Sequence, residues 1–217
     1  MMPLLLWRCP LCAADDALTH ITHPLRADRV LCQKCGAAWR VYRVPGDDFY
    51  LRVIAAGRAG GRVGDERPLA AWYDALKATL SLRALTDPAL PLFPGETLHL
   101  ASGTVELEAE TTDPLFFPES DAPPRADKRG VTGASVGRGR LFLTDERLAW
   151  RSAEGRDADF SLDRLASAYA VMDRGVTLLV DLRLYMLRFL EESLLKWVTM
   201  IGLVAAATDR RITTSHW

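Results

Sequence analysis

Every cysteine of this 217-residue chain lies within its first 35 positions, in two pairs with two residues between the members of each pair. The pairs are Cys9–Cys12 and Cys32–Cys35, and nineteen residues separate them. Two intervening residues let one tight turn aim both sulfurs at a common point, and two such turns supply four thiolates in the tetrahedral arrangement that zinc prefers. The spacing therefore predicts one zinc ion. Because all four ligands come from the protein, no position stays open for catalysis, and we expect the zinc to be structural.

The alternatives for these thiols are two disulfides or four reduced side chains. The apolar first residues have neither a charged segment before them nor a small-residue cleavage site after them, so no secretion signal is predicted. The longest uncharged apolar run, residues 197–207, is shorter than the about 20 residues of a membrane span. We therefore expect a cytoplasmic protein without a transmembrane segment, where paired cysteines favour metal binding. His20 and His23 have a possible ligand spacing, but beside four thiolates we expect them on a strand or loop surface.

The elements that must position the cysteines are short strands. Residues 13–31 have room for two strands and a turn at 24–28, and alternating patterns predict further strands at 39–44 and 49–54, with a turn at 45–48 between them. Gly36 tolerates the left-handed backbone that cysteine turns favour. With these features the chain resembles a zinc ribbon over about residues 7–54. One departure is that Ala13, not glycine, follows Cys12.

We interpret the chain as three parts: a zinc ribbon at 1–56, a glycine-rich linker with an amphipathic helix at 57–94, and a second domain at 95–217. Residues 57–64 carry four glycines without a nucleotide-binding motif, which indicates a flexible linker or a hairpin tip. A helix is predicted to begin at residues 65–68, with an apolar stripe at Leu69, Trp72, Tyr73, Leu76 and Leu80. The stripe is expected to pack on a flanking domain, and a docking helix for a partner is the alternative.

The second domain is predicted to be a strand meander that ends in a helix. Strands are expected at 97–100, 104–108, 139–144, 147–152, 159–162, 166–172, 175–182 and 184–189, with a bend at Ser102-Gly103 and a long loop at 113–136. From Glu191 to about Thr208 the apolar period changes to that of a helix. The fold class is therefore mainly β with α: a small zinc-ribbon domain plus a β-barrel with one opening plugged by a C-terminal amphipathic helix.

The stretch G-R-L-F-L-T-D-E-R-L-A-W-R-S at residues 139–152 resembles two strands of GRAM domains, a branch of the pleckstrin-homology (PH) superfold. The terminal helix, with Trp197 on its inner stripe, is similar to the capping helix of that family. The resemblance covers about residues 95–208. It implies a non-catalytic module that binds phosphoinositides, other membrane lipids or protein segments. It also implies that Lys128, Arg138 and Arg140 contact phosphate, while the simpler interpretation is solvated arginines beside a strand.

Charge and motifs limit the function classes. A net charge of −1 argues against a protein whose whole surface binds nucleic acid or an anionic membrane. Residues 133–137 match G-x-S-x-G, but a strand is predicted to follow them where a hydrolase needs a helix, so no enzyme is predicted. We expect a zinc-containing adaptor or scaffold whose PH-like domain binds a protein partner or, alternatively, an anionic lipid, and no small-molecule substrate. The other hypothesis is a nucleic-acid-associated factor that binds DNA or RNA through Arg40, Arg43 and Trp39 of the ribbon.

Overall fold

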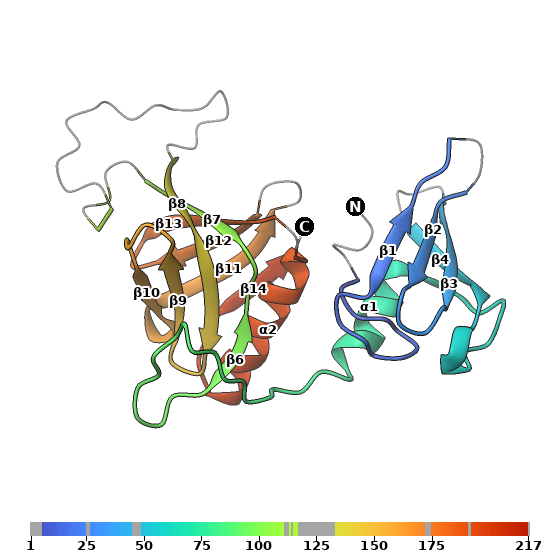
Figure 1. The fold of residues 1–217 in the computed structure, drawn as a ribbon, viewed down its shortest axis with the longest axis horizontal. Coiled ribbons are helices and arrows are strands. Elements are labelled where there is room, and N and C mark those ends of the chain that lie inside the picture. Colours follow the sequence, from blue (N-terminus) through green and yellow to red (C-terminus); the bar gives the residue numbers. More distant parts are fainter. Residues whose placement is uncertain are drawn as a thin grey trace. The chain divides into compact units, whose positions relative to one another are not determined.

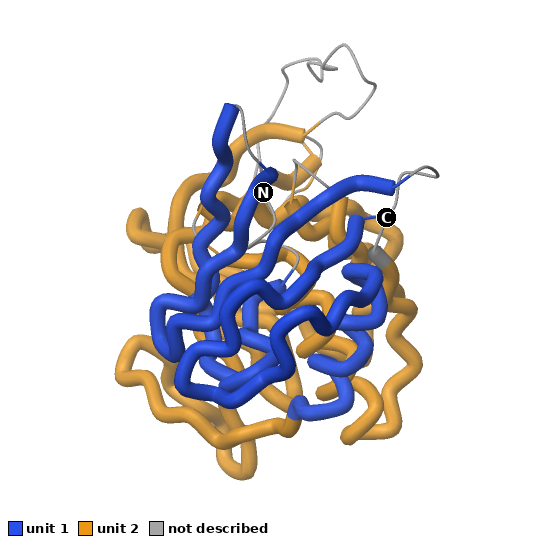
Figure 2. The backbone as a smooth tube through the Cα atoms, turned by 90° about the vertical axis from the view of Figure 1, so that its right-hand side faces the viewer, with its two compact units in different colours: residues 1–80 blue, residues 81–217 orange. Residues whose placement is uncertain are grey.

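The chain forms two compact units, residues 1–80 and residues 81–217, which Figure 2 distinguishes by colour. The computed structural model describes residues 6–24, 27–44, 49–110, 113, 115–116, 133–171, 175–190 and 192–216. The predicted turns at 24–28 and 45–48 and the predicted loop at 113–136 lie partly or wholly outside these ranges.

The first unit is built on an antiparallel sheet whose five strands follow chain order (Figure 1). The strands are β1 (Leu18–Ile21), β2 (Arg29–Cys32), β3 (Ala38–Arg43), β4 (Phe49–Ala55) and β5 (Glu66–Pro68). β1 and β2 are the two short strands predicted between the cysteine pairs, and β3 and β4 confirm the two predicted after them. One face of this sheet is apolar: Val30, Trp39, Val41, Leu51 and Val53 are all buried.

Helix α1 (Leu69–Lys77) covers the apolar face of this sheet and is shorter than the sequence predicts. The predicted helix start at residues 65–68 is wrong, because Glu66–Pro68 extends as β5 and pairs with β4. Trp72 is buried, meets Trp39 edge to face at 6.4 Å between ring centroids, and donates a hydrogen bond to the carbonyl of Leu51 (3.3 Å). The apolar stripe of α1 therefore belongs to the core of the first unit and is not a free docking face.

The second unit is a larger sheet that curls into a half-barrel. Its strands are β6 (Leu98–Ala101), β7 (Val105–Glu110), β8 (Gly133–Thr144), β9 (Arg147–Ser152), β10 (Ala158–Ser161), β11 (Leu165–Val171), β12 (Gly175–Val180), β13 (Arg183–Phe189) and β14 (Thr213–His216). They lie in the order β10-β9-β8-β7-β13-β12-β11-β14, with β6 also paired to β8. Each predicted strand begins within one residue of its expected start except β8, which begins at residue 133 instead of 139.

Because β8 begins at residue 133, the G-x-S-x-G stretch forms the first part of this strand. Residues 133–137 lie inside a strand, and the hydroxyl of Ser135 faces the carboxylate of Glu106 on the neighbouring strand at 3.4 Å. A nucleophile elbow needs a sharp turn from a strand into a helix, and no such turn is present at this position.

β6 and β7 form one bent strand along β8, with the predicted bend at Ser102-Gly103 between them. Ser102 makes the bend possible, because its hydroxyl accepts the backbone N–H of Leu141 at 2.6 Å while its own N–H donates to the Leu141 carbonyl at 2.8 Å. The side chain thus replaces a backbone acceptor that the bend removes from the ladder. The sheet can therefore curl without leaving a buried N–H unpaired.

Helix α2 (Leu194–Ala207) begins three residues later than predicted, after Ser193, whose hydroxyl accepts the N–H of Lys196. Trp197 is fully buried and stacks on Phe189 at 5.1 Å, in agreement with its predicted place on the inner stripe. After the helix the chain returns as β14, which pairs in parallel with β11. This strand is not predicted from the sequence, and it places the backbone of residues 213–216 on a sheet edge.

In place of the predicted barrel, the sheet forms an open half-barrel. Among the described strands, β10 and β14 form opposite ends of the sheet and do not pair with each other. α2 lies along β14, β11 and β12, and its buried residues fill the concave side. The segment before β6 belongs to the same core, since Leu90 packs with Leu98, Phe142 and Ala149. The broad class, mainly β with α, is confirmed.

Candidate metal centre and binding surfaces

Two turns of identical backbone pattern carry the four cysteines. We call residues 9–14 the first knuckle and residues 32–37 the second knuckle. In the first, the N–H of Ala13 donates to the carbonyl of Cys9 (2.9 Å), and in the second the N–H of Gly36 donates to that of Cys32 (2.9 Å). The N–H of each first cysteine in turn donates to the residue five positions later, Ala14 or Ala37. The knuckles are thus two copies of one structure, although their sequences share only the cysteines and one alanine.

Ala13 occupies the position that glycine fills in the second knuckle. Its φ is +55°, and that of Gly36 is +76°, so both residues adopt the left-handed conformation. A β-carbon makes this conformation costly by about 1–2 kcal/mol. The sequence departure at Ala13 therefore leaves the turn unchanged but adds backbone strain.

The four sulfurs converge as one metal ion requires. All lie within 4.8 Å of one another, with 3.8 Å between the sulfurs of Cys9 and Cys35 and 3.7 Å between those of Cys12 and Cys32. A tetrahedron of sulfurs with zinc–sulfur bonds of about 2.3 Å has edges of about 3.8 Å. A disulfide would need about 2.05 Å, and all four cysteines are free. The cluster therefore fits one tetrahedral metal ion and excludes the disulfide alternative.

The protein environment shifts the pKa values of the cysteine thiols in different directions. Burial raises the pKa of the Cys9 and Cys35 thiols. Burial acts in the same direction at Cys32, but the backbone N–H groups of Cys35 and Lys34 outweigh it and lower the pKa of that thiol. Metal binding requires thiolates, so backbone donors inside the second knuckle already support one ligand.

The glycine-rich segment holds the cysteine turns and is not a free linker. Gly57 has a φ of +60°, and a β-carbon there would collide with the carbonyl oxygen of Cys35 and lie 2.5 Å from the nitrogen of Ala37. The N–H of Arg58 donates to the same Cys35 carbonyl at 2.8 Å. Four residues on, Gly61 lies against the side chain of Leu11 in the first knuckle. Sequence reasoning missed this role, although four glycines in eight residues were its signal.

The two histidines near the cysteines lie elsewhere. The imidazole of His20 lies 3.1 Å from a carboxylate oxygen of Asp28, across the β1–β2 hairpin. Among the described residues, the four cysteines form the one group of three or more that could hold a metal ion. His20 and His23 are therefore not part of this centre.

The residues proposed for nucleic-acid binding do not form one surface. Trp39 is 1 % exposed and packs against Trp72, so its ring cannot stack on a base. The guanidinium of Arg43 lies 5.9 Å from the ring centroid of Phe49 at the far end of the hairpin. Arg40 is exposed on the face opposite Trp39, because side chains alternate along β3.

The residues expected to bind phosphate are also not assembled as predicted. Lys128 lies outside the described residues. Arg140 donates to both carboxylate oxygens of Asp87 (2.7 and 3.3 Å) and to the carbonyl of Ser102 (3.1 Å), so a phosphate would have to displace these acceptors. Arg138 is exposed beside Glu106 on β7. Arg140 thus secures the segment before β6 to the sheet.

The T-D-E-R turn between β8 and β9 joins distant parts of the second unit. Arg147 is 5 % exposed, and its guanidinium donates to Glu96 (2.8 and 3.1 Å), to Asp159 (2.7 Å) and to the carbonyl of Pro91 (3.1 Å). The hydroxyl of Thr144 donates to the same Glu96 carboxylate at 2.8 Å. The T-D-E-R motif therefore has a structural role: it supplies the buried guanidinium of Arg147, and a buried charge is tolerated only when it is fully paired.

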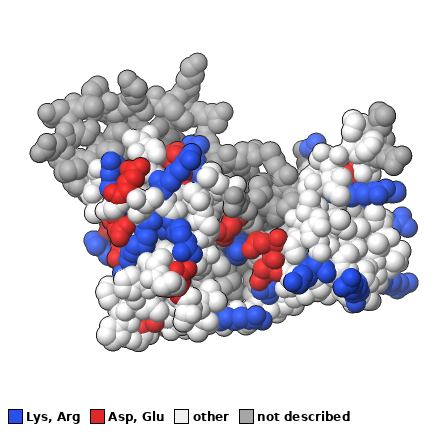
Figure 3. Space-filling model, in the orientation of Figure 1, with Lys and Arg blue, Asp and Glu red and all other residues white. Residues whose placement is uncertain are grey.

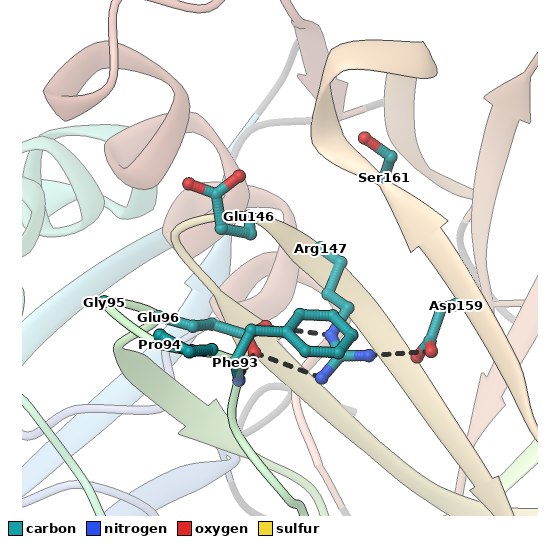
Figure 4. A pocket seen from close by; sticks show the side chains of 8 residues that line it. All are labelled: Phe93, Pro94, Gly95, Glu96, Glu146, Arg147, Asp159 and Ser161. Carbon is teal, nitrogen blue, oxygen red and sulfur yellow. Dashed lines mark hydrogen bonds and ion pairs between the residues drawn. The ribbon is translucent and has the colours of Figure 1, made fainter.

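An open hollow lies over this network, with a volume of about 570 Å³. We call it the Phe93 hollow; it is lined by Phe93, Pro94, Gly95, Glu96, Glu146, Arg147, Asp159 and Ser161. Figure 4 shows the guanidinium of Arg147 between Glu96 and Asp159, with the ring of Phe93 across it; the centroid lies 4.0 Å from the guanidinium carbon. Phe93 is nevertheless 59 % exposed. The hollow thus offers an aromatic ring beside two partly solvated carboxylates, Glu146, which pairs with Arg210, and Asp159, which pairs with Arg147 and Arg151.

No protein-family model and no curated protein matches this chain. None of the described helices is long and apolar enough to cross a membrane.

Proposed function

We propose that this protein is a non-catalytic adaptor in which a zinc ribbon is joined to a GRAM/PH-like half-barrel that binds a basic segment of another protein. The observation that carries this proposal is the Phe93 hollow. An aromatic ring held on a fully paired guanidinium, yet 59 % exposed, resembles the aromatic anchors of binding sites more than a core residue. The second unit contains 16 Lys/Arg against 20 Asp/Glu, a net charge of −4, which favours a basic partner.

The identity of the metal rests on ligand chemistry. Four thiolates in a tetrahedron with edges near 3.8 Å favour zinc, and two knuckles joined by short strands are what a zinc ribbon implies. With four protein ligands the ion has no place for a substrate or a water molecule, which supports a structural role.

The GRAM/PH-like assignment rests on topology. If the bent β6–β7 segment is counted as one strand, seven strands form two antiparallel runs, from β6–β7 to β10 and from β11 to β13, and the first strand pairs with the last, β13. A helix with a buried tryptophan follows directly. This is the order of elements that the resemblance implies, with β14 as an addition.

The metal is tested by elemental analysis of the purified full chain. We expect about one zinc per chain, and Cys32→Ser should lose the metal while the second unit stays folded. A protein with no metal and four thiols that react freely in the native state would overturn this assignment.

The partner site is tested by replacing Phe93 with a photo-crosslinking phenylalanine derivative in the full chain in cells. We expect one predominant protein adduct, and binding of that protein, once purified, should be lost with Phe93→Ala and weakened by Glu146→Gln. Leu92→Ala, an exposed neighbour outside the hollow, is the matched control. Binding that survives Phe93→Ala, or salt-sensitive adsorption to anionic vesicles in place of protein binding, would contradict the proposal.

A further inference from the structure

The outer face of the ribbon sheet carries an ordered row of like charges. Arg29 on β2 lies directly opposite Arg40 on β3, and Arg40 lies directly opposite Arg52 on β4. Residues in register on neighbouring strands project from the same face, and all three side chains are exposed. We call these three residues the arginine row.

The arginine row has little acidic charge close to it. Within the part of the chain that the structure describes, no carboxylate forms an ion pair with Arg29, Arg40 or Arg52. Two acids lie near the row: Asp28 pairs with His20, and Glu66 on β5 lies directly opposite Arg52, with its carboxylate hydrogen-bonded to the hydroxyl of Tyr42. On the face drawn in Figure 3, lysine and arginine side chains lie at several places on the first unit. The unit as a whole has 11 Lys/Arg and 8 Asp/Glu, a net charge of +3.

Two tyrosines adjoin the row on the same face. Tyr42 lies two residues after Arg40 on β3, and Tyr50 lies two residues before Arg52 on β4, so both project with the arginines. Their rings stack at 6.0 Å between centroids with an angle of 26° between the planes, and both are only half-buried. A flat aromatic surface therefore continues the line of positive charge.

Like charges directly opposite each other on a sheet weaken folding, so the Arg29–Arg40 and Arg40–Arg52 pairs cost stability, which Glu66, opposite Arg52, offsets at one end of the row only. A line of guanidinium groups beside exposed rings matches a chain of phosphates that carries flat bases, since the guanidinium groups pair with phosphate oxygens and the rings stack on bases. We propose that this face binds single-stranded nucleic acid, with Arg29, Arg40 and Arg52 on the phosphates and Tyr42 and Tyr50 under the bases. This site goes beyond the adaptor function, since it uses neither the Phe93 hollow nor any residue of the second unit.

The test uses the full metal-loaded chain and fluorescence anisotropy with a labelled oligothymidylate of about 12 nucleotides, a length within the usual range for single-strand binding domains. We expect binding at low salt that weakens steeply as salt rises. Arg40→Ala/Arg52→Ala should weaken it at least about tenfold and reduce the slope of log affinity against log salt by about 1.4, or about 0.7 for each phosphate that is no longer neutralised. The matched control is Arg58→Ala/Arg62→Ala, which removes the same charge from exposed positions of the glycine-rich segment and should leave affinity almost unchanged.

Two further readouts separate this role from a structural one. Because the row opposes folding, Arg40→Ala should leave the unfolding temperature of the first unit unchanged or higher while binding falls. Tyr42→Phe/Tyr50→Phe should keep affinity for the oligonucleotide, whereas Tyr42→Ser/Tyr50→Ser should lower it about tenfold or more. Circular dichroism confirms that the serine variant is folded.

Several outcomes would overturn the proposal. These are an absence of binding at low salt, an equal loss in the Arg58→Ala/Arg62→Ala control, equal affinity for inorganic polyphosphate, and tighter binding to a duplex of the same length. Polyphosphate binding of equal strength would mean that the face recognises charge alone, because polyphosphate has no bases to stack on the tyrosines.

Discussion

At the residue scale, the backbone at Ala13 shows what the cysteine spacing alone does not predict. The spacing predicted a metal cluster, and the four sulfurs converge accordingly. The absence of glycine after Cys12 indicated a less typical turn, yet the two knuckles have the same hydrogen bonds. The hydrogen bonds of the first knuckle fix the turn, so Ala13 is held at a φ of +55° despite its β-carbon.

Ala13 and Gly36 occupy equivalent positions in the two knuckles, and the substitutions Ala13→Gly and Gly36→Ala should change the free energy of unfolding in opposite directions. We expect Ala13→Gly to raise the free energy of unfolding of the metal-loaded first unit by up to about 1 kcal/mol, because strain is relieved. We expect Gly36→Ala to lower it by about 1 kcal/mol, since a β-carbon at Gly36 meets no neighbour and only the conformation is penalised. Urea unfolding at fixed free zinc measures both, and a loss of stability in Ala13→Gly would contradict the strain argument.

The buried pair of Glu96 and Arg147 makes the second unit sensitive to acid. Burial acts to raise the pKa of Glu96, but hydrogen bonds from Arg147, Phe93 and Thr144 outweigh it, and the pKa lies below the ordinary value of 4.5. The unfolded chain then takes up the proton more readily. The pair's contribution to the free energy of unfolding is therefore complete above pH 4.5 and is lost as pH falls towards the pKa of the folded state.

Glu96→Gln should cost about 3 kcal/mol at neutral pH, because it leaves a buried guanidinium short of its main partner. The same variant should show a shallower loss of stability below pH 4.5 than the wild type. Denaturant unfolding across this pH range measures both effects. Glu154→Gln, whose side chain is 61 % exposed and pairs with Arg156, is the control and should change little.

At the element scale, the glycine-rich segment acts as a clamp on the metal centre. Composition indicates a linker, because four glycines in eight residues are typical of flexible chain. What composition does not show is that the backbone of Cys35 approaches Gly57 too closely for a side chain. A similar limit applies at residues 66–68, where local sequence predicts a helix start but pairing with β4 gives a strand.

Gly57→Ala should weaken zinc binding by at least about tenfold, since the new β-carbon collides with backbone atoms that cannot move without shifting a ligand. Gly60→Ala is the matched control. It also has a left-handed φ, +75°, but open space around its α-carbon, so it should cost stability and leave affinity nearly unchanged. Competition with a chromogenic chelator measures both variants, and equal affinities would show that the close approach is unimportant.

At the scale of the whole molecule, most strands were predictable and their assembly was not. The alternation of apolar and polar residues predicts the eight strands β6 to β13, and the change to helical spacing of apolar residues predicts α2. The polar segment at residues 213–216 has no such pattern, and it becomes β14 because the edge of β11 supplies the hydrogen bonds. The arginine row likewise cannot be predicted from local sequence, because it depends on which residues of β2, β3 and β4 pair with one another.

Removal of the metal should affect the two units differently. The core of the first unit lies between its sheet and α1, whereas the half-barrel has its own core of large buried side chains, including Trp150, Trp197 and Phe142. We expect chelation to unfold residues 6–77 and to leave protection of residues 85–216 against hydrogen exchange almost unchanged. Mass spectrometry of exchanged peptides measures this, with zinc added back as the control. Loss of protection in β11–β13 would show that the units do not fold independently.

The duplicated knuckle also determines the routes by which the first unit can assemble. Each knuckle needs only a short local loop, and loops of this size close in about 10–100 ns. Either copy can therefore capture the metal with two sulfurs before the rest of the unit is ordered, and formation of the β1–β2 hairpin then delivers the other copy. We therefore expect two parallel folding routes, and the share of molecules that take each route depends on how readily its own turn forms. A substitution at Ala13 or Gly36 that slows folding through one knuckle leaves the route through the other knuckle available. The refolding rate of the first unit should therefore fall by a smaller factor than its equilibrium constant for folding.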